Sequence, residues 1–263
     1  MRPTTEEFLY FLLWTADTLT MRPTWRNLND PFEVWANRNG LARRLRYMEQ
    51  EKLVERHPTA ELDRVVRLTE TGRLAALGGR DPAERWARAW DGRWRLVLFD
   101  LPSRKRELRM RWWRHLRAAG FGYLQNSVWI TPDSLAEIER VLARESIAVE
   151  TLTLFEGRPA GGETDAQLVA GAWDFATVNV RYEQHQRVLR ELPGTTDLTV
   201  LREWSRRERT AWHAATRLDP LLPQTLLPPD YAGKKAWAAR RQAFAKLGQR
   251  LVESTGAKRH VDT

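Results

Sequence analysis

The sequence predicts a mixed α+β protein made of three successive segments. Residues 1–82 combine helical apolar spacing with two short strand patterns, residues 90–160 alternate between strand and helix, and residues 161–263 contain helical patterns interrupted by prolines. A chain of 263 residues, 42% of them hydrophobic, has enough apolar material for two or three small folded domains. We therefore expect domains at 1–82, 90–160 and 161–263.

Composition excludes several classes of protein. The chain contains no cysteine, which rules out disulfide scaffolds, thiol nucleophiles and cysteine-ligated metal clusters. The apolar run near the N-terminus follows two glutamates and precedes no small-residue cleavage site, so it predicts a helix and not a signal peptide. No window offers the roughly 20 consecutive apolar residues of a membrane span. We expect a soluble cytoplasmic protein with no cofactor.

The formal net charge of +9 is unevenly distributed along the chain. Residues 81–117 carry eleven basic and five acidic side chains, and residues 201–263 carry thirteen and six, whereas residues 118–200 carry six and twelve. Locally basic segments favour anionic partners, although a basic helix face can also be merely solvated. Charge alone therefore does not assign nucleic-acid binding, and a motif is needed.

Two helices are predicted at the start of the first segment. Thr4 or Thr5 is placed to cap the first of them. In the second, Leu41 and Met48 belong to an apolar stripe with helical spacing, and Asn39 is placed as its N-cap.

Two strands and a third helix follow. Leu53–His57 and Arg64–Leu68 have strand patterns, and Thr69 is positioned to cap a closing helix. Helix, helix, two-stranded wing and closing helix is the layout of a winged helix-turn-helix, whose second helix enters the major groove of DNA.

Basic and amide side chains gather where a winged helix-turn-helix contacts DNA. Arginine and asparagine can read base edges in the major groove, and outer arginines can contact phosphates. The predicted DNA-binding residues are Arg38, Asn39, Arg43, Arg44, Arg46, Tyr47, Arg64 and Arg67.

The central segment predicts a ferredoxin-like βαββαβ domain. Leu96–Phe99 is a continuous apolar strand, and a helix follows from the cap Ser103 to Gly120. Two short strands flank Gln125–Ser127, a helix begins after Ser134, and a last strand covers residues 148–155. This order of elements is the split βαβ arrangement.

The third segment predicts a helical domain. Residues 157–165 form a glycine-rich linker, and residues 171–192 and 197–217 have helical patterns. Four prolines after residue 217 exclude a continuous helix there, and a last helix is expected over residues 234–252.

Several motifs resemble the PaaX family of bacterial repressors. The central ones are FDLP at residues 99–102, the basic helix after it, and GFGYLQNSVWITP at 120–132. LTETGR at 68–73, AWDF with RY at 172–182 and the string DPLLP…LLPPDY at 219–231 are similar to the family as well. The central core also resembles the small ferredoxin-like CRISPR adaptation proteins.

The resemblance implies a dimeric repressor of aromatic or phenylacetate catabolism. Such a protein binds a palindromic double-stranded DNA operator and is released by an acyl- or aryl-coenzyme A, the archetypal effector being phenylacetyl-coenzyme A. Arginines of the basic helix could hold the coenzyme phosphates and aromatic residues could stack an aryl group, although tryptophans also pack in ordinary cores. The predicted ligand-binding residues are Arg109, Trp113, Trp129, Trp173 and Tyr182.

The segment expected to bind DNA departs from the family pattern. Ala42 and Tyr47 stand where the family typically has arginine, and PTAELD at 58–63 replaces a Gly-Arg-Arg wing tip. Operator sequence is therefore not transferable, and an interaction protein that has lost DNA binding is one alternative.

A metal-dependent nuclease is the enzymatic alternative. Asp100 follows the first central strand, where the CRISPR adaptation proteins carry a metal-binding aspartate, and two such carboxylates across a dimer could hold Mg²⁺. The five histidines lack the spacing of common metal motifs, and no phosphate-binding glycine loop is present. Our main expectation is a regulator without catalytic residues.

Overall fold

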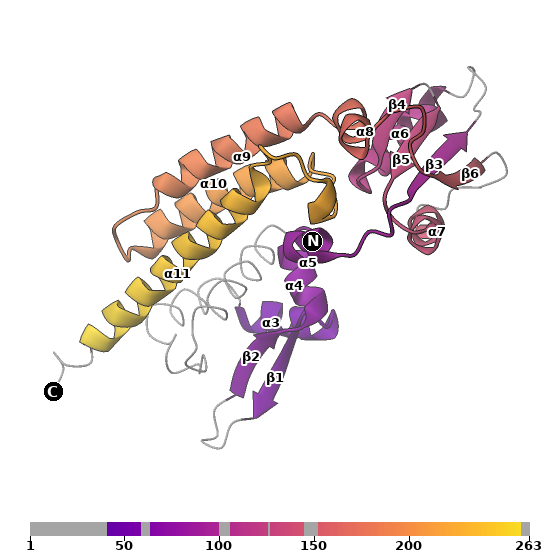
Figure 1. The fold of residues 1–263 in the computed structure, drawn as a ribbon. Helices are drawn as coiled ribbons and strands as arrows, with labels where there is room; N and C mark the ends of the chain where they lie inside the picture. Colours follow the sequence, from indigo (N-terminus) through magenta and orange to yellow (C-terminus); the bar gives the residue numbers. More distant parts are fainter. Residues whose placement is uncertain (1–40, 59–63, 100–105, 126, 145–151, 259–263) are drawn as a thin grey trace. The chain divides into compact units, whose positions relative to one another are not determined.

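The computed structural model (Figure 1) describes residues 41–58, 64–99, 106–125, 127–144 and 152–258. The chain forms two compact units, and each joins stretches that are distant in sequence. The first unit contains the residues up to Asp81 together with 186–209 and 235–263, and the second contains Pro82–His185 and Thr210–Lys234. The predicted domains at 1–82, 90–160 and 161–263 are each one continuous stretch of sequence, whereas each compact unit combines separate stretches.

The first unit begins with the second helix, hairpin and closing helix that the sequence predicts. These elements are α3 (Leu41–Gln50), β1 (Val54–Pro58), β2 (Arg64–Leu68) and α4 (Glu70–Ala76). β1 and β2 pair antiparallel, from Val54 opposite Leu68 to Pro58 opposite Arg64. The predicted first helix, the cap Asn39 and most of the wing tip lie outside the described residues, so the complete winged helix-turn-helix remains a prediction.

Local chemistry fixes the connections between these elements. After α3 the chain turns through Lys52, whose φ is 55°, and the amide of Leu53 donates to the carbonyl of Met48 at 2.8 Å. The Thr69 hydroxyl caps α4 by accepting from Gly72 N at 3.0 Å, and it donates to the Lys52 carbonyl at 2.5 Å. A Cβ on Gly72 would lie 1.9 Å from the Leu53 carbonyl oxygen, so this close approach requires glycine.

The core of the first unit joins the elements between α3 and α4 to parts of three long helices. Those helices are α9 (Phe175–Arg190), α10 (Leu198–Thr216) and α11 (Gly233–Lys258), whose residues are divided between the two units. The core contains Met48, Leu53, Val54, Ala76, Leu77, Leu189, Leu201, Trp204, Phe244 and Leu247. Burial of these apolar side chains stabilises the association of residues 48–77 with residues 189–247.

The second unit contains the predicted βαββαβ order. Its elements are β3 (Trp94–Phe99), α6 (Arg106–Ala118), β4 (Gly122–Gln125), β5 (Val128–Thr131), α7 (Leu135–Arg144) and β6 (Leu152–Gly157). The sheet order is β4-β5-β3-β6, with every neighbouring pair antiparallel. Side chains of α6 and α7 cover one sheet face, with Trp112, Leu116 and Ile138 packing on Val97 and Trp129.

The prediction of one helix over 171–192 is wrong. α8 (Asp165–Ala172) ends before Trp173, whose φ of −131° is extended, and α9 begins at Phe175. Asp174 caps α9, because its Oδ1 accepts from Thr177 N at 2.9 Å and its Oδ2 accepts from the Thr177 hydroxyl at 2.6 Å. The helical apolar spacing continues across this break, which is why the sequence pattern did not reveal it.

Other elements lie close to their predicted positions. A short helix α5 (Pro82–Ala87), which the sequence did not predict, precedes β3. The predicted helix at 197–217 corresponds to α10, and α11 extends the predicted 234–252 at both ends. Between them the chain is irregular apart from one 3-10 turn, η3 (Gln224–Leu226), as the prolines require.

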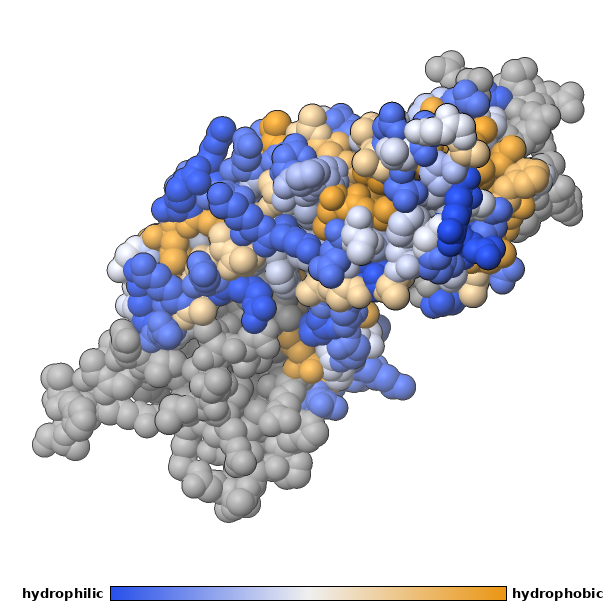
Figure 2. All heavy atoms as spheres, in the orientation of Figure 1, coloured by the Kyte–Doolittle hydropathy of each residue, from blue (hydrophilic) through white to orange (hydrophobic). Residues whose placement is uncertain are grey.

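The coloured residues in Figure 2 are mostly hydrophilic on this face, with smaller hydrophobic areas between them. Large apolar side chains that remain exposed include Met110, Phe155, Val180 and Leu218. Within the described part of the chain, each helix is too short or too polar to cross a membrane.

Candidate functional site

Helix α3 is the candidate nucleic-acid interface of the first unit. Arg46 and Tyr47 are exposed on it, Tyr47 by 43%, whereas Met48 is completely buried. The helix therefore has a core face and a solvent face, as the predicted recognition helix requires. Arg43 and Arg44 belong to the same helix, and Arg64 and Arg67 to β2; Arg38 and Asn39 lie outside the described residues.

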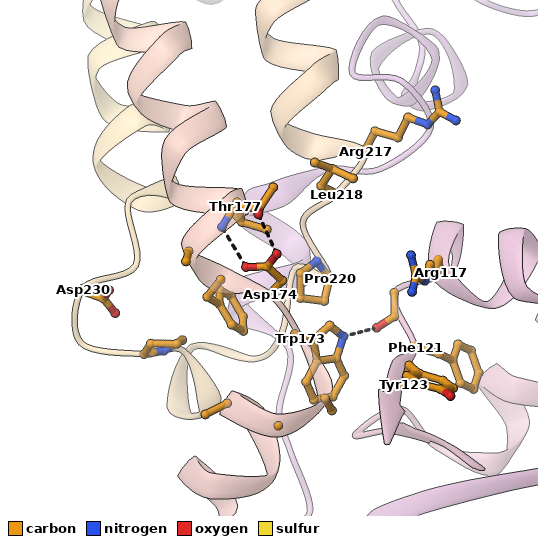
Figure 3. Close-up of a pocket in the computed structure, with 18 residues that line it drawn as sticks. Arg117, Phe121, Tyr123, Trp173, Asp174, Thr177, Arg217, Leu218, Pro220 and Asp230 are labelled. Carbon is orange, nitrogen blue, oxygen red and sulfur yellow. Dashed lines mark hydrogen bonds between the residues drawn. The ribbon is translucent and has the colours of Figure 1, made fainter. Parts of the chain in front are cut away.

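The second unit contains an open cleft of about 830 Å³ (Figure 3). One side is formed by the end of α6 and by β4, including Arg117 and Tyr123. The α8–α9 junction supplies Trp173, and the segment after α10 supplies Arg217 and Pro220. A concave site lined by aromatic, apolar and a few charged groups is typical of small-molecule binding.

Trp173 is held as a rigid wall of this cleft. Its indole Nε1 donates to the Gly120 carbonyl at 3.1 Å, and its ring centroid lies 6.0 Å from that of Trp94. A Cβ on Gly122 would lie 2.7 Å from both Trp173 and Ala172, so only glycine lets β4 approach so closely. The indole can therefore offer a fixed apolar surface to a ligand.

Charged groups at the cleft differ in whether they already have partners. Arg117 and Arg217 are exposed, and neither forms an ion pair with a carboxylate of the described chain. The Asp174 carboxylate is occupied by Thr177, and the hydrogen bond from the Thr177 hydroxyl is the main cause that lowers its pKa. The cleft thus offers two cations beside aromatic surface, an arrangement that suits an anionic ligand with an apolar part.

A buried polar network lies behind the cleft. The Asp219 carboxylate, 1% exposed, accepts from the Tyr182 hydroxyl at 2.5 Å, from the Tyr231 hydroxyl and from Leu221 N at 2.8 Å. Trp86 Nε1 donates to the Tyr231 oxygen at 3.1 Å. Burial is the largest cause that raises the pKa of both tyrosines, so each hydroxyl keeps its proton and can donate.

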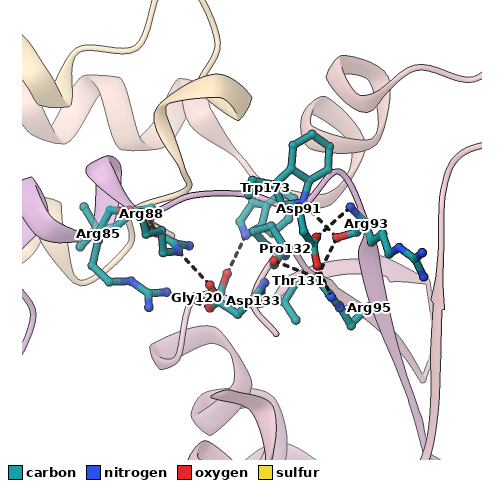
Figure 4. Close-up of polar contacts among 12 residues, drawn as sticks. Arg85, Arg88, Asp91, Arg93, Arg95, Gly120, Thr131, Pro132, Asp133 and Trp173 are labelled. Atoms are coloured by element: carbon teal, nitrogen blue, oxygen red, sulfur yellow. Dashed lines mark hydrogen bonds and ion pairs between the residues drawn. The ribbon is translucent and has the colours of Figure 1, made fainter. Parts of the chain in front are cut away.

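A second polar cluster joins α5 to the turn between β5 and α7 (Figure 4). Asp133 accepts from Arg85 Nη2 at 2.8 Å and from Arg88 Nε at 2.9 Å, and Arg88 also donates to the Leu221 carbonyl. Burial acts to raise the pKa of Asp133, but the two guanidinium groups outweigh it and the pKa is lowered. This cluster connects Leu221, which follows the lining residue Pro220, to the end of strand β5 in the same unit.

Of the five predicted ligand-binding residues, Trp173 lines the cleft and the other four do not. Trp129 is completely buried in the sheet core, 5.8 Å from the Trp113 ring, so ordinary packing describes both. Tyr182 is buried and bonded to Asp219, and Arg109 is half-buried on α6.

The sequence interpretation assigned no site role to Asp174, Arg217, Asp219 or Tyr231. A signal was present for the last two, because the string DPLLP…LLPPDY begins with Asp219 and ends with Tyr231. In the structure these two residues, which are distant in sequence, are in contact, because the Tyr231 hydroxyl donates a hydrogen bond to the Asp219 carboxylate.

The nuclease alternative depends on Asp100, which lies outside the described residues. Within the described ranges, no group of three or more histidine or acidic side chains is arranged to hold a metal ion.

Comparisons with known proteins identify the middle of the chain. Residues 87–169 match the family model described as the PaaX protein central Cas2-like domain, which confirms the resemblance to PaaX proteins over this range. A search of curated proteins found no match. A solved structure, the uncharacterized protein Rv0674 from Mycobacterium tuberculosis, is similar with a TM-score of 0.49 and 24% identity over 83% of this chain and 84% of that chain.

Proposed function

We propose that this chain, which carries the central Cas2-like domain of PaaX proteins at residues 87–169, is a DNA-binding transcription regulator. The observation that carries the proposal is the order of elements along the chain, in which helix α3, the β1–β2 hairpin and helix α4 precede that domain. An exposed face with Arg46 and Tyr47 above a buried Met48 suits a helix that enters the major groove. We assign it the role of a repressor that binds a palindromic operator as a homodimer.

The cleft of the second unit is the proposed effector site. Trp173 and Pro220 supply apolar surface for an aryl or acyl group, and Arg117 and Arg217 supply cations for the phosphates of a coenzyme A thioester. The proposed effector is therefore an acyl- or aryl-coenzyme A of phenylacetate or related catabolism. Release from DNA follows if the effector binds the DNA-incompetent conformation more tightly, because it then shifts the population toward that state.

DNA binding is tested by salt-titrated affinity for random and operator-containing duplexes. A DNA-binding protein shows a steep fall in affinity with salt, and each lost phosphate contact makes the log–log slope shallower by about 0.9. We expect Arg43→Ala/Arg44→Ala to abolish binding. The control is Arg206→Ala on α10, an exposed arginine paired with Glu203, which should leave binding unchanged. Equal binding by the double variant and the wild type would refute the assignment of α3.

Effector binding is tested by thermal shift with phenylacetyl-coenzyme A and a panel of other thioesters. A ligand that binds only the folded state adds about 2.7 kcal/mol to the free energy of unfolding when its concentration is a hundred times Kd. It therefore raises the melting temperature. Arg117→Ala and Arg217→Ala should weaken this shift without altering the melting temperature of the free protein, because both side chains are exposed. A chain stabilised by none of the thioesters would exclude this class of effector.

A further inference from the structure

We infer that Asp219 is a positioning residue of the cleft, and that it governs ligand affinity by holding three separate wall segments in one arrangement. This inference rests on the proposed function of the cleft as an effector site. It concerns how that site is kept in shape, since Asp219 itself lies beneath the surface and not among the lining residues.

Three of the hydrogen bonds that the Asp219 carboxylate accepts come from three different stretches of chain. The first goes to Tyr182 on α9, the helix that supplies Phe175 and Val178 to the cleft. The second goes to Tyr231, which directly follows the lining residue Asp230. One buried carboxylate therefore connects α9 to the 228–231 turn.

The third hydrogen bond fixes the segment that contains Asp219 itself. Asp219 Oδ1 accepts from Leu221 N at 2.8 Å, which closes a turn around the lining residue Pro220. Leu221 is completely buried with a φ of 50°, a left-handed conformation that a leucine seldom adopts. A side chain that bonds the Leu221 amide stabilises this unusual backbone and so sets the direction of the wall at Pro220 and Leu218.

Aromatic contacts extend the network to the surface of the cleft. The Tyr231 ring lies 5.8 Å from that of Phe175 and 6.1 Å from that of Tyr182, both in edge-to-face geometry. Loss of the carboxylate removes the acceptor that aligns the two hydroxyls. Phe175 and Pro220 can then move apart, and the cleft loses its shape without losing any group that touches the ligand.

Asp219→Asn and Tyr231→Phe are the test variants, and Thr216→Val is the matched control. Thr216 is also buried, and its hydroxyl bonds the Trp212 carbonyl at 3.1 Å, but that bond lies within α10 and joins no wall segments. The control therefore reports what loss of a buried hydrogen bond does in general.

Hydrogen–deuterium exchange measures the positioning without any ligand. In Asp219→Asn, we expect exchange over residues 217–232 to rise at least tenfold while the strands β3–β6 keep their protection. Thr216→Val should leave residues 217–232 as in the wild type even if both variants melt at lower temperature. Unchanged exchange in Asp219→Asn, or an equal rise in the control, would overturn the inference.

Binding measurements then connect position to affinity. The probes are phenylacetyl-coenzyme A and the anionic aryl dye anilinonaphthalene sulfonate. Dye bound in the cleft is defined as the dye binding that is lost in Trp173→Ala. We expect Asp219→Asn to weaken the cleft-bound probes at least tenfold and Thr216→Val to weaken them less than twofold. If phenylacetyl-coenzyme A fails to bind the wild type, the proposed effector is wrong, and dye binding with the exchange data still decides the role of Asp219.

Discussion

Arg240 donates from Nε to Glu208 Oε1 at 2.8 Å, and both side chains are completely buried between α10 and α11 in the first unit. The guanidinium of Arg240 also lies 5.7 Å from the Trp237 ring centroid and 6.0 Å from that of Phe244. A buried ion pair costs desolvation and adds little net stability, but removing one partner leaves a charge in an apolar core. The pair joins α10 to α11 within the buried part of the first unit.

Breaking this pair from one side should be more harmful than removing both partners. We expect Glu208→Gln to lower the free energy of unfolding by about 3–5 kcal/mol, because Arg240 remains charged and buried. The double variant Glu208→Gln/Arg240→Met should lose less than the sum of the two single changes, measured by urea unfolding. Additive losses would show that the two side chains do not act as a pair.

Arg240→Met alone should make stability depend on pH. Burial is the main cause that raises the pKa of Glu208, so without the opposing charge of Arg240 the folded protein holds the proton of that carboxyl more tightly than the unfolded chain. The deficit in unfolding free energy relative to the wild type should therefore be smallest below about pH 4 and grow as pH rises from 4 to 7. A constant difference across that range would contradict a raised pKa of Glu208 in the absence of Arg240.

The stabilising contribution of Asp133 should be lost as pH falls, which is opposite to the pH dependence expected for Glu208 in Arg240→Met. Arg85 and Arg88 lower its pKa below the unfolded value of about 3.9, so its contribution is complete above that pH and is lost as pH falls through the folded value. The gap in unfolding free energy between wild type and Asp133→Asn should be largest at pH 6 and shrink between pH 4 and 2. Glu203→Gln, in an exposed pair with Arg206, is the control and should change stability by less than about 1 kcal/mol.

Gly122→Ala should destabilise the protein where β4 packs against the α8–α9 junction at the cleft. The added methyl group would overlap Ala172 and Trp173, each 2.7 Å away, and such overpacking typically costs about 1–3 kcal/mol. Gly171→Ala on α8 is the matched control, because its Cβ would meet nothing within 4 Å and alanine favours a helix by about 1 kcal/mol over glycine. Thermal unfolding should show a lower melting temperature for the first variant and an equal or higher one for the second.

Trp173→Ala should abolish effector binding, whereas loss of a tryptophan outside the cleft should not. We expect it to abolish the thioester-induced thermal shift and to destabilise the free protein by up to about 3 kcal/mol, because the Gly120 carbonyl loses its donor and a void replaces the indole. Trp90→Ala is the control, since that ring packs on Trp94 at 5.4 Å and does not line the cleft. A thermal shift that survives in Trp173→Ala would place the effector elsewhere.

The sequence by itself determined the elements whose causes are local. The strand at Leu96–Phe99, the helix ended by Gly120 and the cap at Thr69 follow from apolar spacing, glycine and a hydroxyl at fixed positions. The break at Trp173 escaped because a cap such as Asp174 interrupts a helix without interrupting the apolar pattern.

Only the tertiary structure decided which distant residues share a site. Apolar periodicity reports which face of an element is buried but not against what, so Trp129 and Trp173 look alike in the sequence although one fills the sheet core and the other lines the cleft. The union of Tyr182, Asp219 and Tyr231 depends on the path of the chain between them, because hydrogen bonds act over a few ångströms in space whatever the separation in sequence.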